Sequence, residues 1–552
     1  MTRTFGTFAQ PGSFVSPAGQ AGEILVGRKV ANTSFLRALL QFGSFDQYCF
    51  LVGENGDIEA IHGLLEGVPP AVVERIVVRN VLELPDALAR GEISVLHQNS
   101  HADQMGPLIA LRDRYATRAV PITGQIHSLS YPAMMGNYLD TALAHPTSID
   151  AVFCSSEPGK EVVERCFADV LAGLAAKGLE LEAPEWEMPV IPLGISCDAL
   201  AGGDRAAMRR TIGIPEDAFV VLSMARFTEF DKMDIFPVLT AFASFKEVVG
   251  DGGRKPWLLL AGARQGTKTP EMLELWAGGL GLGDQLSLRV DFPEAEKADL
   301  LACADLFIAP SDNPQETFGI TVIEAMAAGL PIIAADFNGY KDTVPAEVGI
   351  RVATHWNADM ERVSELGPVL YQRPLHLFLG QSIEVDLGEL ADALERLYRD
   401  EALCSQMSEA ARARTRDVYD WSRVIPQYEA VWNELASRPF RQRPDARHPL
   451  LMDFQRVFGH YTTTVRNTSR RVKRSALADL VCQQENTYPI YPELTNIFDG
   501  NAVMSALHLA QEPIEIGSLE QQVAEHVYTH SPWRASLLVA WLVKHGLVES
   551  EA

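Results

Sequence analysis

Residues 304–336, ADLFIAPSDNPQETFGITVIEAMAAGLPIIAAD, contain the pattern that indicates the fold. Residues 305–310 form a short apolar run that is typical of a strand buried in a parallel sheet. Residues 319–328 predict a helix, which Gly329 ends and after which Pro331 opens the next strand. This order of strand, loop, helix and strand predicts an α/β domain with a parallel sheet.

Two glutamates stand on either side of the predicted helix start. Glu316 falls in the loop at the carboxyl edge of the sheet, and Glu324 falls in the early part of the helix. Ligands of open α/β sheets bind at that edge, and the amides near Gly319, Ile320 and Thr321 would face an anion such as phosphate. A carboxylate one turn further accepts ribose hydroxyls, and a carboxylate before the helix accepts hydroxyls of a second polyol. A nucleotide sugar, with two diols around a diphosphate, fits this arrangement.

Apolar strand candidates alternate with helical patterns along most of the chain. A first series consists of QYCFLV (47–52), RIVVR (75–79), ISVLH (93–97), AVPITG (119–124), DAVFC (150–154) and MPVIP (188–192). A second series consists of FVVLSMA (219–225), WLLLAGA (257–263), LSLRVD (286–291), DLFIAP (305–310) and PIIAAD (331–336). Two such series predict two Rossmann-like domains that face a cleft.

Length and composition set further limits. A chain of 552 residues is too long for one ordinary domain, so we expect two large domains and an appended region. The formal net charge of −25 disfavours general nucleic-acid binding. The seven cysteines form no C-x-x-C pair and no zinc spacing, and we expect reduced thiols in a cytoplasmic protein. The sequence has no run of about 18 apolar residues, so we expect no transmembrane helix.

The segment from Pro310 to Ile333 resembles the E-x7-E signature of retaining GT-B glycosyltransferases, in particular family four, also called group 1. The signature's two glutamates fall on Glu316 and Glu324. The resemblance implies that Glu316 holds hydroxyls of the donor sugar and that Glu324 holds the ribose. It also implies that the backbone amides of the helix start contact the sugar and the diphosphate. These amides belong to Phe318, Gly319, Ile320, Thr321 and Val322.

The segment VVLSMARFTEFDKMDIF resembles the Arg and Lys phosphate clamp of the same family, on Arg226 and Lys232. These cations would neutralise the leaving diphosphate, on which charge grows as the glycosidic bond breaks. The chain departs from the family pattern in two ways. The spacing is one residue longer, and Met233 replaces the common glycine after the lysine.

The first domain offers weaker motifs. His127 in VPITGQIHSLSY occupies a place where family members often carry a histidine that faces the donor sugar. Gly27 lies between an expected strand and a helix, where related enzymes use a glycine turn, and an ordinary tight turn is the alternative. His97 and His101 end the preceding strand and suit loop contacts better than a metal site. The nucleotide base is expected near Val290.

The family-like segments also set the domain limits. VIPLGIS (190–196) resembles the crossing into the second domain, and residues 419–437 resemble the helix that crosses back. We expect a GT-B fold with an N-terminal acceptor-side domain over 1–196, completed by 419–437. We expect a donor domain over 197–418, and a linker with a helical C-terminal extension over 438–552.

The resemblance implies retaining transfer of a sugar from a nucleoside-diphosphate sugar to an acceptor hydroxyl, with no metal and no other cofactor. The chain has no Asp-x-Asp motif, the usual metal handle of the other main glycosyltransferase fold. Glycan, lipid-linked and protein acceptors stay open, as do a homodimer and a peripheral membrane contact through the basic cluster Arg466–Arg474. The alternative is a catalytically idle GT-B protein that acts through its C-terminal tail. The donor base, the sugar and the role of residues 438–552 stay open.

Overall fold

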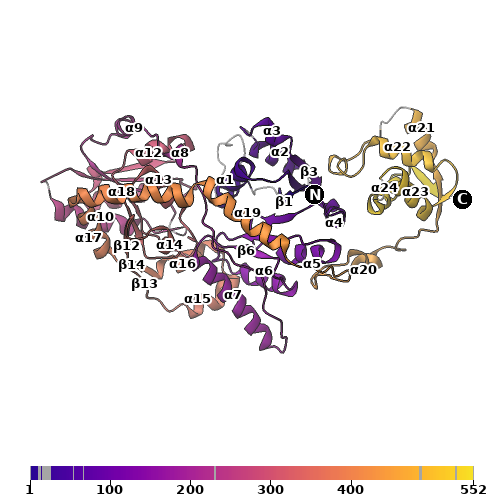
Figure 1. Cartoon of the computed structure of the whole chain (residues 1–552), viewed down its shortest axis with the longest axis horizontal. Helices are drawn as coiled ribbons and strands as arrows, with labels where there is room; N and C mark the ends of the chain where they lie inside the picture. Colours follow the sequence, from indigo (N-terminus) through magenta and orange to yellow (C-terminus); the bar gives the residue numbers. More distant parts are fainter. Residues whose placement is uncertain are drawn as a thin grey trace. The chain divides into compact units, whose positions relative to one another are not determined.

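The computed structural model describes residues 2–9, 14, 27–53, 55–65, 67–228, 230, 232–250, 252–483, 488–528 and 531–550 (Figure 1). Contacts between residues divide the chain into two compact units. The first unit comprises residues 1–50, 60–77 and 85–449, and the second comprises 51–59, 78–84 and 450–552. Among the described residues, no helix is long and apolar enough to cross a membrane.

The first Rossmann-like domain is built on a six-stranded sheet with the order β3-β2-β1-β4-β5-β6. The pairs β1–β4, β4–β5 and β5–β6 run parallel. The strands are β1 (Thr4–Phe8), β2 (Gln47–Val52), β3 (Ile76–Asn80), β4 (Val95–Gln98), β5 (Ile122–Gln125) and β6 (Ala151–Phe153). The helices are α1 (Gly27–Phe42), α2 (Asn55–Leu64), α3 (Pro70–Val73), α4 (Leu84–Ala89), α5 (Met105–Tyr115), α6 (Ala133–Leu143) and α7 (Glu157–Ala175).

The second Rossmann-like domain has a fully parallel six-stranded sheet with the order β12-β11-β10-β7-β8-β9. Its strands are β7 (Phe219–Met224), β8 (Pro256–Gly262), β9 (Leu286–Val290), β10 (Leu306–Ala309), β11 (Ile332–Ala335) and β12 (Gly349–Val352). A small antiparallel pair joins β13 (Thr354–Trp356) to β14 (Ile383–Val385). The helices are α8 (Cys197–Leu200), α9 (Arg205–Ile212), α10 (Phe236–Val249), α11 (Thr269–Gly279), α12 (Lys297–Ala302), α13 (Ile320–Ala328), α14 (Tyr340–Thr343), α15 (Glu361–Leu366), α16 (Gln372–Gln381), α17 (Leu387–Arg399) and α18 (Glu401–Arg414).

Both sheets share a switch in strand order that creates a binding edge. The chain adds three strands in one direction, returns to the middle of the sheet and adds three in the other direction. The reversal falls between β1 and β4 in the first sheet and between β7 and β10 in the second. Loops that follow neighbouring strands at such a point diverge and leave a crevice. In the second domain these loops carry Arg226, after β7, and Glu316, after β10.

Helix α19 (Trp421–Ser437) ties the two domains together. Figure 1 shows α18 and α19 as the orange helices that pass from the second domain to the first. α19 packs against α1, and Trp432 donates a hydrogen bond from Nε1 to Thr123 Oγ1 on β5 (3.1 Å). A Cβ at Gly194 would lie 2.4 Å from the Trp421 ring. The crossing therefore requires glycine at 194.

The second unit contains a short three-stranded antiparallel sheet with the order β16-β15-β17. Apolar side chains of the sheet and the helices form a separate core that includes Val472, Leu507, Leu519 and Leu538. The elements are α20 (Phe454–Phe458), β15 (Arg471–Arg474), α21 (Ala476–Gln483), α22 (Gly500–Leu509), β16 (Ile514–Glu515), α23 (Ile516–His526), α24 (Pro532–Lys544) and β17 (Val548–Ser550).

The two sheets confirm the expected fold class of two Rossmann-like domains with a mainly helical C-terminal region. The predicted helix at 319–328 is α13, flanked by Gly319 and Gly329. The predicted strand at 188–192 is wrong. Only an isolated bridge forms there, because Pro189 and Pro192 have no amide hydrogen to donate to a sheet. The strand expected before Gly27 lies outside the described residues. The first described strand is β1, which was not among the predicted strands.

Candidate functional site

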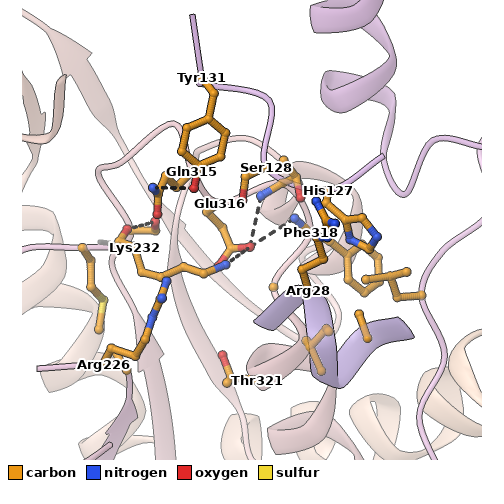
Figure 2. Close-up of a pocket in the computed structure, with 18 of the residues that line it drawn as sticks. Arg28, His127, Ser128, Tyr131, Arg226, Lys232, Gln315, Glu316, Phe318 and Thr321 are labelled. Atoms are coloured by element: carbon orange, nitrogen blue, oxygen red, sulfur yellow. Dashed lines mark hydrogen bonds and ion pairs between the residues drawn. The ribbon is translucent and has the colours of Figure 1, made fainter. Parts of the chain in front are cut away.

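A cavity of about 680 Å³ opens at the carboxyl edges of both sheets. The first domain contributes the start of α1 and the loops after β4 and β5. The second contributes the loops after β7 and β10 and the start of α13. The structure brings eight of the predicted site residues together around this cavity: His127, Arg226, Lys232, Glu316, Phe318, Gly319, Ile320 and Thr321. Figure 2 shows Arg226 and Lys232 on one side of it and His127 on the other.

Glu316 is a buried carboxylate between these groups (Figure 2). Its Oε1 accepts hydrogen bonds from the amides of Thr317 (3.1 Å) and Phe318 (3.2 Å). Lys232 Nζ lies 3.2 Å from both carboxylate oxygens. Burial by itself raises the pKa of Glu316, but Lys232 and the two amides outweigh burial and lower the pKa below its usual value. Glu316 is therefore ionised at neutral pH and can accept hydroxyl hydrogen bonds.

Lys232 reaches Glu316 from a constrained turn. Its φ of 65° lies in the left-handed region, which residues other than glycine rarely adopt. Ser311 donates a hydrogen bond from Oγ to the Lys232 carbonyl oxygen (2.5 Å), which fixes the turn to the loop after β10. Met233, which stands where related clamps carry glycine, is buried and lines the cavity. In this chain the residue with the left-handed backbone conformation is Lys232, and Met233 after it does not have a positive φ.

Helix α13 begins at the cavity without a side-chain cap. The residue before it, Gly319, has a φ of 91°, and a Cβ there would lie 2.2 Å from the Tyr340 ring. The first amides of a helix have no partner within the helix, and Ile320 and Thr321 line the cavity. The helix start thus offers amides and the positive end of the helix dipole to an anion.

Glu324 points to a different partner. Its buried Oε1 lies 2.9 Å from Nζ of Lys297 in α12, and Glu294 binds the same ammonium group. Burial raises the pKa of Glu324, although Lys297 opposes this shift. Glu324 does not line the cavity between the two domains. Its expected bond to a ribose stays a prediction.

His127 lies across the cavity from the cation pair (Figure 2). Its Nε2 lies 2.7 Å from the carbonyl oxygen of Asn99, so Nε2 carries the proton and donates it. Burial lowers the pKa of His127 to about 3, and nearby Arg28 adds to the lowering. The ring is therefore neutral, and Nδ1 is an acceptor.

Two of the other predicted donor-site residues, Val290 and Val322, are not among the described residues that line the cavity. Val322 is fully buried in the core of the second domain, and Val290 ends β9. Gly27 is the first residue of α1, and the next two residues, Arg28 and Lys29, line the cavity.

His97 and His101 are buried side chains of the first domain, and neither lines the main cavity. His97 lies 2.9 Å from Thr123 Oγ1 among aromatic rings, and His101 Nε2 lies 3.0 Å from the Tyr138 hydroxyl. These contacts fit structural roles.

Sequence reasoning missed a hydrogen-bonded bridge across the cavity. Gln315 Nε2 donates to Nδ1 of His376 in α16 (2.8 Å) and to the hydroxyl of Tyr131 (3.2 Å) from the first domain. With Nδ1 accepting, Nε2 of His376 carries the proton and donates it to Ser130 Oγ (3.1 Å). The sequence offers no signal for this bridge, because its members are far apart in the chain.

The charge of the cavity is opposite to that of the chain. Its described lining holds four cations, Arg28, Lys29, Arg226 and Lys232, and one carboxylate, Glu316. Arg28 also lies 3.2 Å from Asp103. Among the described residues, no group of three or more His, Cys, Asp or Glu side chains is placed to hold a metal ion. The lining suits a ligand with several negative charges.

Part of the chain is similar to known glycosyltransferase sequences. Residues 204–365 match the family model described as "Glycosyl transferases group 1". D-inositol 3-phosphate glycosyltransferase 1 of Catenulispora acidiphila is 28% identical over 349 residues, which cover 60% of this chain and 78% of the relative. D-inositol 3-phosphate glycosyltransferase of Geodermatophilus obscurus is 33% identical over 159 residues, which cover 28% of this chain and 34% of the relative.

Solved structures share the fold at low sequence identity. A glycosyltransferase from Rickettsia africae has a TM-score of 0.52 at 13% identity, covering 79% of this chain and 100% of that one. The Anabaena protein HepE in complex with UDP has a TM-score of 0.51 at 16% identity, covering 78% and 100%. The two Rossmann-like domains of this chain therefore have the GT-B fold, and residues 204–365 are similar to the group 1 glycosyltransferase model.

Proposed function

We propose that this chain transfers a sugar from a nucleoside-diphosphate sugar to an acceptor hydroxyl, with retention of configuration and without a metal or other cofactor. The observation that carries the proposal is the convergence of Arg226, Lys232, Glu316 and the open start of α13 on one cavity. Cations and helix amides match a diphosphate, and the ionised carboxylate matches sugar hydroxyls.

The same geometry suggests how the groups share the work. The diphosphate lies between the Arg226 and Lys232 side chains and the amides of α13. As the bond from the anomeric carbon to the phosphate oxygen breaks, negative charge grows on the diphosphate, and these fixed positive groups stabilise it. The acceptor oxygen bonds to the anomeric carbon on the same face, and a departing phosphate oxygen takes the acceptor's proton. No protein nucleophile is required.

Two carboxylates and one histidine position the donor in this proposal. Glu316 accepts hydroxyl hydrogen bonds of the sugar, and neutral His127 offers Nδ1 to a further hydroxyl from the opposite wall. Glu324 accepts the ribose hydroxyls while Lys297 continues to compensate its charge.

UDP-linked sugars and an inositol phosphate are the first substrates to test. The Anabaena protein was solved in complex with UDP and also with UDP-glucose, which supports UDP as the nucleotide of the donor. The names of the sequence relatives point to D-inositol 3-phosphate. Arg28 and Lys29 supply positive charge on the first-domain wall, beyond the pair proposed for the diphosphate, and suit a phosphate on the acceptor.

The test is to incubate the full chain with UDP-linked hexoses and D-inositol 3-phosphate in the presence of EDTA. NMR of the product gives the configuration at the new glycosidic bond. A product with the donor's configuration supports the proposal, and an inverted product contradicts the retaining mechanism. Activity that EDTA abolishes and a divalent ion restores contradicts metal independence. Absence of donor cleavage and of nucleotide binding with every common nucleotide sugar favours the idle interaction protein.

A further inference from the structure

Gln315 lines the cavity directly before Glu316, and its side chain is held by both Rossmann-like domains. Its Nε2 donates to His376 Nδ1 (2.8 Å) in the second domain and to the Tyr131 hydroxyl (3.2 Å) in the first. A side-chain amide nitrogen carries two hydrogens, so both hydrogens are bound within the protein. The plane of the Gln315 carboxamide is therefore fixed.

The amide oxygen of Gln315 stays available to a ligand. Among the described residues no group donates to Oε1, and this oxygen is not one of the enclosed polar atoms that lack a partner. Because Gln315 lines the cavity, Oε1 can meet a ligand there. An amide oxygen only accepts hydrogen bonds, as phosphate oxygens do, so the matching ligand group is a hydroxyl rather than the diphosphate.

The partners of Gln315 are themselves fixed. His376 is 1% exposed, and its Nε2 donates to Ser130 Oγ (3.1 Å). The His376 ring meets the Tyr131 ring edge-on, with centroids 4.9 Å apart. Asn313 donates from Nδ2 to the His376 carbonyl oxygen (3.0 Å) and so ties the loop after β10 to α16. The carboxamide is thus oriented before a ligand arrives, and a hydroxyl that binds to it does not have to order it.

Gln315 lies away from the proposed phosphate site. In Figure 2 it lies on the upper side of Glu316, whereas Arg226 and Thr321 lie on the lower side. A diphosphate bound at the start of α13 places C1 of the sugar on that lower side, and C4 lies across a hexopyranose ring from C1. We propose, on the basis of the proposed function, that Gln315 is a specificity-determining residue. Its Oε1 accepts a hydrogen bond from the C4 hydroxyl of the donor sugar.

Calorimetric titration of the full chain with UDP, UDP-glucose and UDP-galactose tests this proposal. The two sugars differ only in the configuration at C4, and UDP alone reports the nucleotide contacts. The unchanged chain is expected to bind one UDP-hexose about tenfold more tightly than the other, because the wrong epimer leaves Oε1 unpaired. Gln315→Met keeps a similar volume without the amide. It is expected to reduce this ratio to about twofold while the affinity for UDP stays the same.

His376 acts on the sugar only through Gln315, so it is a positioning residue. His376→Phe removes one acceptor of the Gln315 amide and is expected to lower the epimer ratio to about threefold, with UDP affinity unchanged. His376→Asn offers an amide oxygen as a new acceptor and is expected to keep more of the ratio than His376→Phe does. Because asparagine fills less of the site than phenylalanine, a purely structural role of His376 predicts the opposite order.

Gln427→Met, at an exposed glutamine of α19, is the matched control and is expected to bind all three ligands like the unchanged chain. The melting temperature of every variant checks that the fold is intact.

Three outcomes overturn the proposal about Gln315. The first is equal affinity of the unchanged chain for the two UDP-hexoses. The second is an epimer ratio that Gln315→Met leaves unchanged. The third is unchanged binding of both UDP-hexoses by Gln315→Met together with a raised KM for the acceptor, which assigns Oε1 to the acceptor. In each case UDP binding by the unchanged chain still supports the proposed donor site, whereas absence of UDP binding overturns the UDP-sugar donor and this inference together.

Discussion

At the residue scale, Lys232 and Glu316 form an ion pair in the wall of the cavity. The ammonium group contacts both carboxylate oxygens at 3.2 Å, and it lowers the pKa of an acid that burial alone would raise. A diphosphate that enters the cavity offers the lysine a second anion. The same side chain thus keeps the sugar-binding carboxylate ionised and contributes to the proposed phosphate site.

Lys232→Ala removes a cation from the site of growing negative charge. We expect kcat/KM to fall by about 10²–10³-fold, the range for loss of one preorganised electrostatic group. The pKa of Glu316 is also expected to rise, because burial then acts without the lysine. Steady-state kinetics with the best UDP-sugar measures the loss. Lys268→Ala, at an exposed lysine of the same domain, is the control, and an equal loss there would contradict the role of Lys232.

Asp312 provides a second test at this scale, with pH as the variable. Burial raises its pKa to about 8, although the Asp234 amide donates to the carboxyl group. Between about pH 4 and pH 8 the unfolded chain loses this proton while the folded chain keeps it, so the stabilising contribution decreases as pH rises.

Asp312→Asn should therefore stabilise the protein relative to the unchanged chain. The gain in melting temperature is expected to be small near pH 4, to grow through this range and to level off above about pH 8. Thermal unfolding across this range measures the difference. A difference that does not change with pH would show that Asp312 is ionised in the folded chain.

At the element scale, α13 depends on the glycine that precedes it. Gly319→Ala places a Cβ at a φ of 91° and 2.2 Å from the Tyr340 ring. We expect a loss of stability of about 1–3 kcal/mol from backbone strain and a displaced helix start that weakens UDP binding at least tenfold. Gly136→Ala in α6, where a Cβ meets no atom within 4 Å, is the matched control. Unfolding and UDP titration distinguish the two variants, and normal UDP binding by Gly319→Ala would refute the role of the helix start.

The elements also show what the sequence could predict. Local sequence signals predicted three neighbouring elements. A continuous apolar run predicted β10, two flanking glycines marked the ends of α13, and a proline marked the start of β11. β1 gave no such signal, because its sequence TFGTF alternates threonine with phenylalanine around a glycine, although all five residues are buried. The bridge from Gln315 to His376 and Tyr131 arises only when the domains meet, so no local pattern reveals it.

At the scale of the whole molecule, every described residue that lines the cavity belongs to the first unit and precedes residue 450. α19 ends at Ser437, before the last segment of the second unit begins at residue 450. A chain that ends at Pro449 is therefore expected to bind UDP within about twofold of the full chain. Isothermal titration of both chains measures this ratio. Loss of UDP binding by a folded truncated chain would show that residues 450–552 contribute to the donor site.

The most direct test of the account is a calorimetric titration of the full chain with UDP, GDP, ADP and dTDP in EDTA, repeated with Arg226→Ala and Lys232→Ala. The account predicts that one nucleotide diphosphate, with UDP expected first, binds without a metal and that each variant weakens its binding at least tenfold. Unchanged affinity in both variants would contradict the claim that this cavity holds the donor diphosphate.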